Sequence, residues 1–121
     1  MDINITKDDF DLTEELEIFN KNSSDHGAVS IFIGKVRPEN GLQSMQIDCY
    51  PEMAQKEIKN MAEIACSKWT LNNIRVLHRY GSLKPNDNIV LVITGSSHRS
   101  DSMSARSEEH TSELQSPMYL V

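Results

Sequence analysis

The spacing of hydrophobic residues predicts two amphipathic helices in this chain. The longer one begins at Pro51, because proline suits the first position of a helix, and it closes at Asn72–Asn73. Its apolar residues recur every three or four positions and form one stripe of Ala54, Ile58, Met61, Ala62, Ala65 and Trp69. A shorter stripe of Leu12, Leu16 and Phe19 predicts a helix that starts at Asp11, where Glu14 completes a capping-box-like pattern.

Continuous apolar runs predict two buried strands, Ala28–Ile33 and Ile89–Thr94, since a strand covered on both faces carries few polar residues. Met45–Cys49 alternates apolar and polar residues, which is typical of a half-covered strand. The remaining predicted elements are an edge strand at Asn4–Thr6, a strand at Ile74–Tyr80, a turn at Lys84–Asp87 and a helix that opens over Ser96–Ala105. This order predicts a single α+β domain with helices packed on a mixed, mostly antiparallel sheet.

The composition agrees with one globular domain and excludes several other classes of protein. The 121 residues are 38% hydrophobic and 25% charged, and no apolar run is long enough for a membrane helix. The net charge is −6, and residues 1–25 hold eight acidic residues against two basic ones. Without a clustered basic face, nucleic acid is not an expected partner. The acidic start has no leader-peptide pattern and two cysteines are too few for a disulfide framework, so we expect a cytoplasmic protein.

A short basic segment follows the first apolar strand and is a candidate anion site. Lys35 and Arg37 lie two positions apart, so in an extended chain their side chains point to the same side. Gly34 would let a phosphate approach the backbone closely. The alternative interpretation is a solvated strand end whose two cations face water.

A second basic segment, Ser96-Ser97-His98-Arg99, follows the other apolar strand and opens the last predicted helix. A cation is disfavoured at a helix N-terminus unless a bound anion shares the backbone N–H groups with it. His98 could also carry a proton, since histidine titrates near neutral pH. The alternative is a polar helix cap with Arg99 turned to solvent. Arg79 and Lys84 either extend the same anion pocket or face water.

The other histidines and the cysteines suggest structural roles. His78 lies within a predicted strand, and His26 and His110 fall in predicted loops. Cys49 and Cys66 are interpreted as small core residues, because neither has a cationic setting that would favour a thiolate. No Cys-x-x-Cys or His-x-x-x-His spacing occurs, so no metal site is predicted.

These segments together resemble the large, catalytic subunit of molybdopterin synthase, the MoaE family. The matching stretches are GAVSIFIGKVRPENG (Gly27–Gly41), YPEMAQKEIKNMAEIA (Tyr50–Ala65), VLHRYGSL (Val76–Leu83) and NIVLVITGSSHRSDSM (Asn88–Met103). Their order and spacing agree with the family from about Gly27 to Ala105. The resemblance implies an α/β hammerhead-like single domain.

The resemblance also implies a sulfurtransferase that converts cyclic pyranopterin monophosphate (precursor Z) to molybdopterin by adding two sulfurs. The sulfur arrives as a thiocarboxylate on the C-terminus of a small ubiquitin-like subunit, and a homodimer of large subunits forms the centre of a heterotetramer. By resemblance, Lys35, Val36 and Arg37 bind the substrate. His98 and Arg99 complete the pocket and stabilise charge as the cyclic phosphate opens. No cofactor is implied.

The end of the sequence departs from the family. Residues 1–105 are interpreted as the large-subunit domain, whereas RSEEHTSELQS (Arg106–Ser116) resembles a translated sequencing adapter, so residues 106–121 are expected to be a non-native or disordered tail. The family has catalytic lysines in this region, and residues 106–121 contain none. The chain as written is therefore expected to be impaired. The alternative function is a non-catalytic dimeric scaffold that binds the small subunit or a phosphate ligand.

Overall fold

A computed structural model describes residues 1–22, 26–38, 41, 43–97 and 119–120. Along the chain the elements are β1 (Asp2–Thr6), α1 (Leu12–Asn22), β2 (Ala28–Lys35), β3 (Met45–Ile47), α2 (Pro51–Trp69), β4 (Leu71–Arg79), β5 (Gly81–Leu83), β6 (Asn88–Ser96) and β7 (Tyr119–Leu120). They form the α+β domain that the sequence predicts. None of the helices in the described ranges is both long and apolar enough to span a bilayer.

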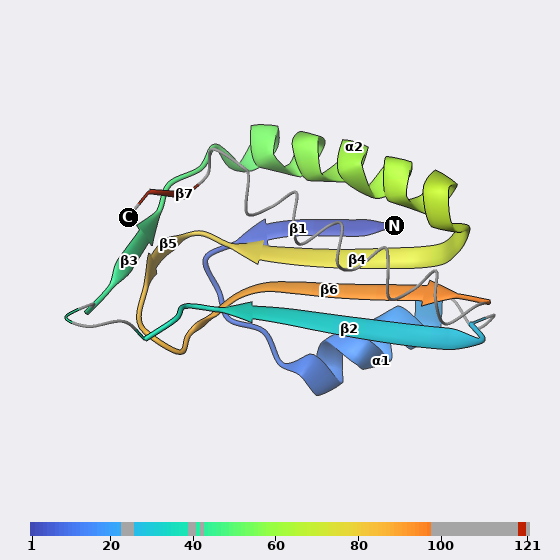
Figure 1. The fold of residues 1–121 in the computed structure, drawn as a ribbon, viewed down its shortest axis with the longest axis horizontal. Coiled ribbons are helices and arrows are strands. Elements are labelled where there is room, and N and C mark those ends of the chain that lie inside the picture. Colours follow the sequence, from blue (N-terminus) through green and yellow to red (C-terminus); the bar gives the residue numbers. More distant parts are fainter. Residues whose placement is uncertain (23–25, 39–40, 42, 98–118, 121) are drawn as a thin grey trace.

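The strands form two sheets. The larger sheet has four strands in the order β1-β4-β6-β2, and β1 with β4 is its parallel pair. The smaller sheet has the antiparallel order β5-β3-β7. Figure 1 shows the smaller sheet at the end of the larger one where β2 and β4 finish. The prediction of a mixed, mostly antiparallel sheet is therefore confirmed, as is the edge position of the first strand.

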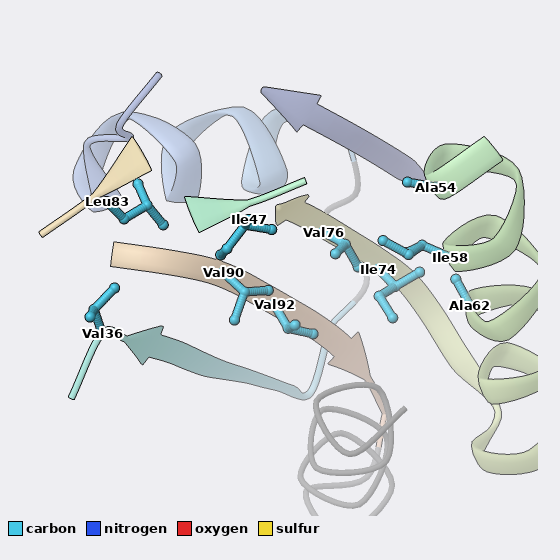
Figure 2. Packing of buried hydrophobic residues seen from close by; sticks show 10 residues of the cluster. All are labelled: Val36, Ile47, Ala54, Ile58, Ala62, Ile74, Val76, Leu83, Val90 and Val92. Carbon is cyan, nitrogen blue, oxygen red and sulfur yellow. The ribbon is translucent and has the colours of Figure 1, made fainter. Parts of the chain in front are cut away.

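Helices α1 and α2 cover opposite faces of the larger sheet. Side chains alternate across a strand, so β6 contributes to both cores. Val90 and Val92 pack in the core beneath α2, which also holds Ala54, Ile58, Ala62, Ile74 and Val76. Leu91 and Ile93 pack instead with Phe19 of α1. Figure 2 shows the α2 core continuing through Val36, Ile47 and Leu83 into the smaller sheet, so both sheets share one hydrophobic interior.

Helix α2 confirms the predicted start and stripe, but the predicted end is wrong. The helix finishes at Trp69, and Thr70 adopts a left-handed conformation with φ 51° while its N–H donates to the carbonyl of Cys66. Left-handed closures usually carry glycine or asparagine, so a threonine in this place does not mark the helix end in the sequence. Asn73 is instead buried in β4, where its Oδ1 accepts a 2.9 Å hydrogen bond from the N–H of Ile74.

One strand prediction and one helix prediction also need correction. β2 was expected to be buried, yet it lies at the edge of the larger sheet and leaves Val29 41% exposed. A run of apolar residues indicates that other parts of the protein cover both faces of a strand. It does not indicate that another strand pairs with each of its two edges. Ser96, expected to open a helix, is the last residue of β6, and the rest of that predicted helix lies outside the described residues.

Strand β5 was not predicted because it is three residues long and follows β4 almost directly. Gly81 opens it with φ +95°, a conformation that other residues rarely adopt. This glycine lets the chain leave the larger sheet after Tyr80 and enter the smaller one. The N–H of Tyr80 donates to the carbonyl of Thr6 at 3.0 Å, so the end of β1 is held at the same place.

Candidate functional site

The Lys35–Arg37 segment lies where β2 ends, and its side chains alternate between solvent and core. Lys35 and Arg37 are exposed, whereas Val36 is fully buried. The backbone N–H of Val36 donates to the carbonyl of Asp87 at 2.9 Å, and its own carbonyl accepts from the N–H of Asn86 at 2.8 Å. Val36 therefore anchors the segment on the turn before β6, and the side chains of both cations remain on the solvent side.

A β-bulge lies at the start of this segment. The ladder between β2 and β6 shifts register between Gly34 and Lys35, so that Gly34 pairs with Val90 and Lys35 pairs with Asn88. Bulges change the direction of a strand and of the side chain that follows, and they are common next to functional sites. The direction of Lys35 thus depends on the position of Asn88.

Asp9 is a carboxylate held beside this bulge. Its Oδ1 accepts hydrogen bonds from Nδ2 of Asn88 at 3.0 Å and from the N–H of Phe10 at 2.8 Å. The bond from Asn88 is the largest cause of a pKa lowered below the usual aspartate value; partial burial opposes it, and the charges of Arg79 and Lys35 add to it. Asp9 therefore supplies a negative charge near Lys35 at neutral pH.

The second basic segment starts from the opposite end of the same strand pair. Ala28 pairs with Ser96 and Lys35 pairs with Asn88. Seven residue steps separate these pairs, which is about 23 Å along a strand. Ser97 lies against Gly27, where an added Cβ would collide with the carbonyl oxygen of Ser97. The predicted site residues His98 and Arg99, which come next in the sequence, lie outside the described residues.

The sequence left open whether Arg79 and Lys84 extend the anion pocket or face water, and the structure distinguishes the two residues. The side chain of Arg79 is only 11% exposed and donates hydrogen bonds to backbone carbonyls, so it does not face water. Lys84 is exposed, and its backbone N–H donates to Oδ2 of Asp87 at 2.8 Å within the predicted turn. Lys84 therefore faces solvent, whereas the side chain of Arg79 is mostly buried and binds backbone carbonyls.

A cavity of about 660 Å³ opens between the start of α2 and the ends of β1 and β3. Its walls include Lys7, Ile47, Cys49, Tyr50, Met53 and Tyr80. The Nζ of Lys7 lies 5.4 Å from the ring centroid of Tyr80. The sequence does not predict this cavity, because its lining comes from segments far apart in the chain that carry no shared motif.

Cys49 and Cys66 have the structural role that the sequence predicts. Both are half-buried and pack against the α2 core. Burial raises the pKa of the Cys49 thiol, and the neighbouring charge of Asp48 raises it further. Cys49 is therefore protonated at neutral pH and is a poor nucleophile.

Of the histidines in the described segments, His78 is buried and His26 is half-buried. His78 is fully buried in β4, and its Nδ1–H donates to the carbonyl of Arg79 at 2.8 Å, which confirms the predicted role within the sheet. His26, predicted to be a loop residue, packs its ring against Phe19. His110 lies outside the described residues. Within those residues, no group of three His, Cys, Asp or Glu side chains is placed to hold a metal ion.

This fold is that of solved MoaE structures. The MoaE protein from Burkholderia ambifaria MC40-6 superimposes with a TM-score of 0.83 at 33% identity, over 90% of this chain and 73% of that one. Molybdopterin synthase from Staphylococcus aureus gives a TM-score of 0.77 at 25% identity, over 89% of this chain and 80% of that one. The fold thus defines the class of protein.

The family follows from the sequence comparison. The family model described as MoaE protein matches residues 5–109, and the chain belongs to this family. A molybdopterin synthase catalytic subunit from Brucella melitensis is 41% identical over 88% of this chain and 66% of its own length. The same subunit from Mesorhizobium japonicum is 39% identical over 80% of this chain and 62% of its own length. The chain therefore spans just under two-thirds of these relatives.

Proposed function

We propose that this chain is the large, catalytic subunit of a cytoplasmic molybdopterin synthase. The observation that carries the proposal is its membership of the MoaE family, with 41% identity to a curated catalytic subunit. The proposed reaction converts cyclic pyranopterin monophosphate to molybdopterin. Two sulfurs come from the thiocarboxylated C-terminus of a small ubiquitin-like subunit, which is the proposed partner.

The chemistry of the described residues supports a reaction in which the partner, and not this chain, supplies the sulfur. If the partner delivers the sulfur nucleophile, the large subunit needs to supply orientation and charge stabilisation. Lys35 and Arg37 present two exposed cations from a segment that Val36 anchors, which suits recognition of the substrate phosphate. The protonated thiol of Cys49 fits a large subunit that needs no nucleophile of its own.

We further propose that each anion pocket combines two copies of the chain. Lys35 and Ser97 lie at opposite ends of the β2–β6 ladder, and an arginine side chain spans far less than the length of that ladder. His98 and Arg99 of one copy would therefore complete the pocket of Lys35 and Arg37 in the other. A closed two-fold dimer gives two equivalent pockets of this kind. This dimer is the proposed centre of the heterotetramer.

Complementation between inactive variants tests the shared pocket. Arg37→Ala and Arg99→Ala would each remove one half of every site. In a co-expressed mixture, half of the dimers would be mixed and each would keep one intact site, so about a quarter of the parental activity returns. A mixture without activity, from variants shown to form mixed dimers, would place both halves in one chain and refute the shared pocket.

The complementation experiment needs a chain whose C-terminal region supports activity. Residues 106–121 contain no lysine, so we propose that the chain as written turns over poorly. A chimera in which the corresponding region of the Brucella melitensis subunit replaces residues 106–121 should form molybdopterin from precursor Z and the thiocarboxylated partner. The chain as written is the matched control. A folded chimera that binds the partner but forms no product would favour the alternative, a non-catalytic scaffold.

A further inference from the structure

Arg79 belongs to the HRYG stretch, which the site described so far does not use. It is the last residue of β4, and its guanidinium reaches the backbone of two other segments. Nη1 donates to the carbonyl of Asn88 at 2.9 Å, and Nε and Nη2 donate to the carbonyl of Lys7 at 3.4 and 3.2 Å. The side chain thus joins the start of β6 to the segment after β1.

An arginine suits this place for a geometric reason. Its planar guanidinium holds several N–H donors in fixed directions, so one side chain can serve two carbonyls at once. A lysine keeps the charge but carries its donors on a single nitrogen at the end of a flexible stem. With Arg79 only 11% exposed, water would replace the lost hydrogen bonds poorly.

The residue that Arg79 holds is the one opposite Lys35. Asn88 pairs with Lys35 directly after the register shift, so its backbone position sets the geometry of the bulge. Asp9 holds the same residue by accepting a hydrogen bond from Nδ2 of Asn88, and its Oδ1 lies 3.8 Å from Nη1 of Arg79. Asn88 is therefore fixed through both its carbonyl and its side chain.

We propose that Arg79 is a positioning residue for the anion site: by fixing Asn88 it fixes the bulge, and through the bulge the directions in which Lys35 and Arg37 point. Arg79 does not contact the anion, because its donors are turned to backbone carbonyls. The inference rests on the proposed function for the identity of the anion, a substrate phosphate. The placement of residues 35–37 is a property of the chain alone.

The test uses Arg79→Lys, with Arg75→Lys as the matched control. Arg75 lies on the same strand, its side chain is 13% exposed, and it is paired with Glu15 at 2.7 Å and with Asp2 at 3.4 Å. Its loss therefore costs comparable interactions away from Lys35. Amide NMR signals of residues 35–37 report the position of the segment, and titration with inorganic phosphate reports the anion affinity.

Arg79→Lys should move the amide signals of residues 35–37 and weaken phosphate binding about tenfold, the lower end of the cost of losing a supporting residue at metal sites. Arg75→Lys should lower the free energy of unfolding and leave both readouts unchanged. Equal behaviour of the two variants in both readouts would overturn the inference.

Two further outcomes keep the inference separate from the proposed function. If the parental chain binds no phosphate, the anion site fails, and the amide signals alone decide whether Arg79 positions the segment. If Arg79→Lys does not fold, Arg79→Gln replaces it, since a neutral amide fills less space and can still donate to one backbone carbonyl. Unmoved signals of residues 35–37 in Arg79→Gln would then refute the role of Arg79 in the bulge.

Discussion

The imidazole of His26 lies directly over Gly95 of β6, where an added Cβ would collide with Nδ1. The same ring stacks on Phe19, with centroids 5.0 Å apart and planes 18° apart. Gly95→Ala should therefore push the ring out and lower the free energy of unfolding by about 1–3 kcal/mol, the usual cost of overpacking. Urea unfolding measures the effect. His26→Ala in the same chain should recover part of it, and an unaltered stability of Gly95→Ala would contradict the contact.

The ion pair between Glu15 and Arg75 should stabilise the attachment of α1 to the sheet. Nε of Arg75 donates to Oε2 of Glu15 at 2.8 Å, and both side chains are 13% exposed. Glu15→Gln should cost about 2 kcal/mol, as expected for a hydrogen bond to a charged group that water reaches poorly. Glu14→Gln is the control, since Glu14 is exposed on the same helix. Equal unfolding midpoints for the two variants would count against the pair.

His78 should make the stability depend on pH. Burial lowers its pKa from 6.5 to about 4, although the hydrogen bond to Arg79 acts in the opposite direction. Between these two values the unfolded chain binds a proton that the folded chain excludes, so stability falls as the pH drops from 6.5 toward 4. A shift of this size corresponds to about 3 kcal/mol at most. Asp9, with its lowered pKa, loses its own contribution only at more acidic pH.

The variant His78→Gln tests this dependence. It should lower the stability at pH 7, because a packed side chain is replaced, but it should also flatten the fall between pH 6.5 and 4. Chemical unfolding across this range gives both quantities. A parallel fall in the variant and the parent would assign the acid sensitivity to other groups.

Cys49 should react slowly with alkylating reagents. Burial and the charge of Asp48 raise its pKa, so little thiolate is present at neutral pH. In a Cys66→Ser background, iodoacetamide should modify Cys49 more slowly than a free cysteine peptide. Asp48→Asn should raise the rate modestly, because burial, the larger cause, remains. A rate equal to that of the peptide would contradict the raised pKa.

Local periodicity predicted the elements that pack through one regular face. The α2 stripe and the run of β6 are repeated over many residues, so each was found with its correct type. The end of α2 was not predicted, because Thr70 closes the helix in a left-handed conformation that a threonine rarely adopts. β5 was missed because its three residues gain their strand conformation from pairing with β3.

The candidate site was predictable only where it depends on neighbouring residues. The alternation of exposed Lys35 and Arg37 around buried Val36 follows from the geometry of extended chain. The hydrogen bond from Arg79 to the carbonyl of Asn88 depends on the end of β4 lying beside the start of β6. No spacing in the sequence predicts that arrangement. The cavity beside Lys7 was unpredictable for the same reason.

Because alternate residues of β6 serve different helices, this strand cannot tolerate a change in its length. One inserted residue would send the valines toward α1 and Leu91 and Ile93 toward α2, and both interiors would be mismatched at once. Natural variation in length should therefore avoid residues 88–96 and accumulate in connections such as that between β2 and β3. The fixed length of β6 therefore sets how both helices pack on the sheet.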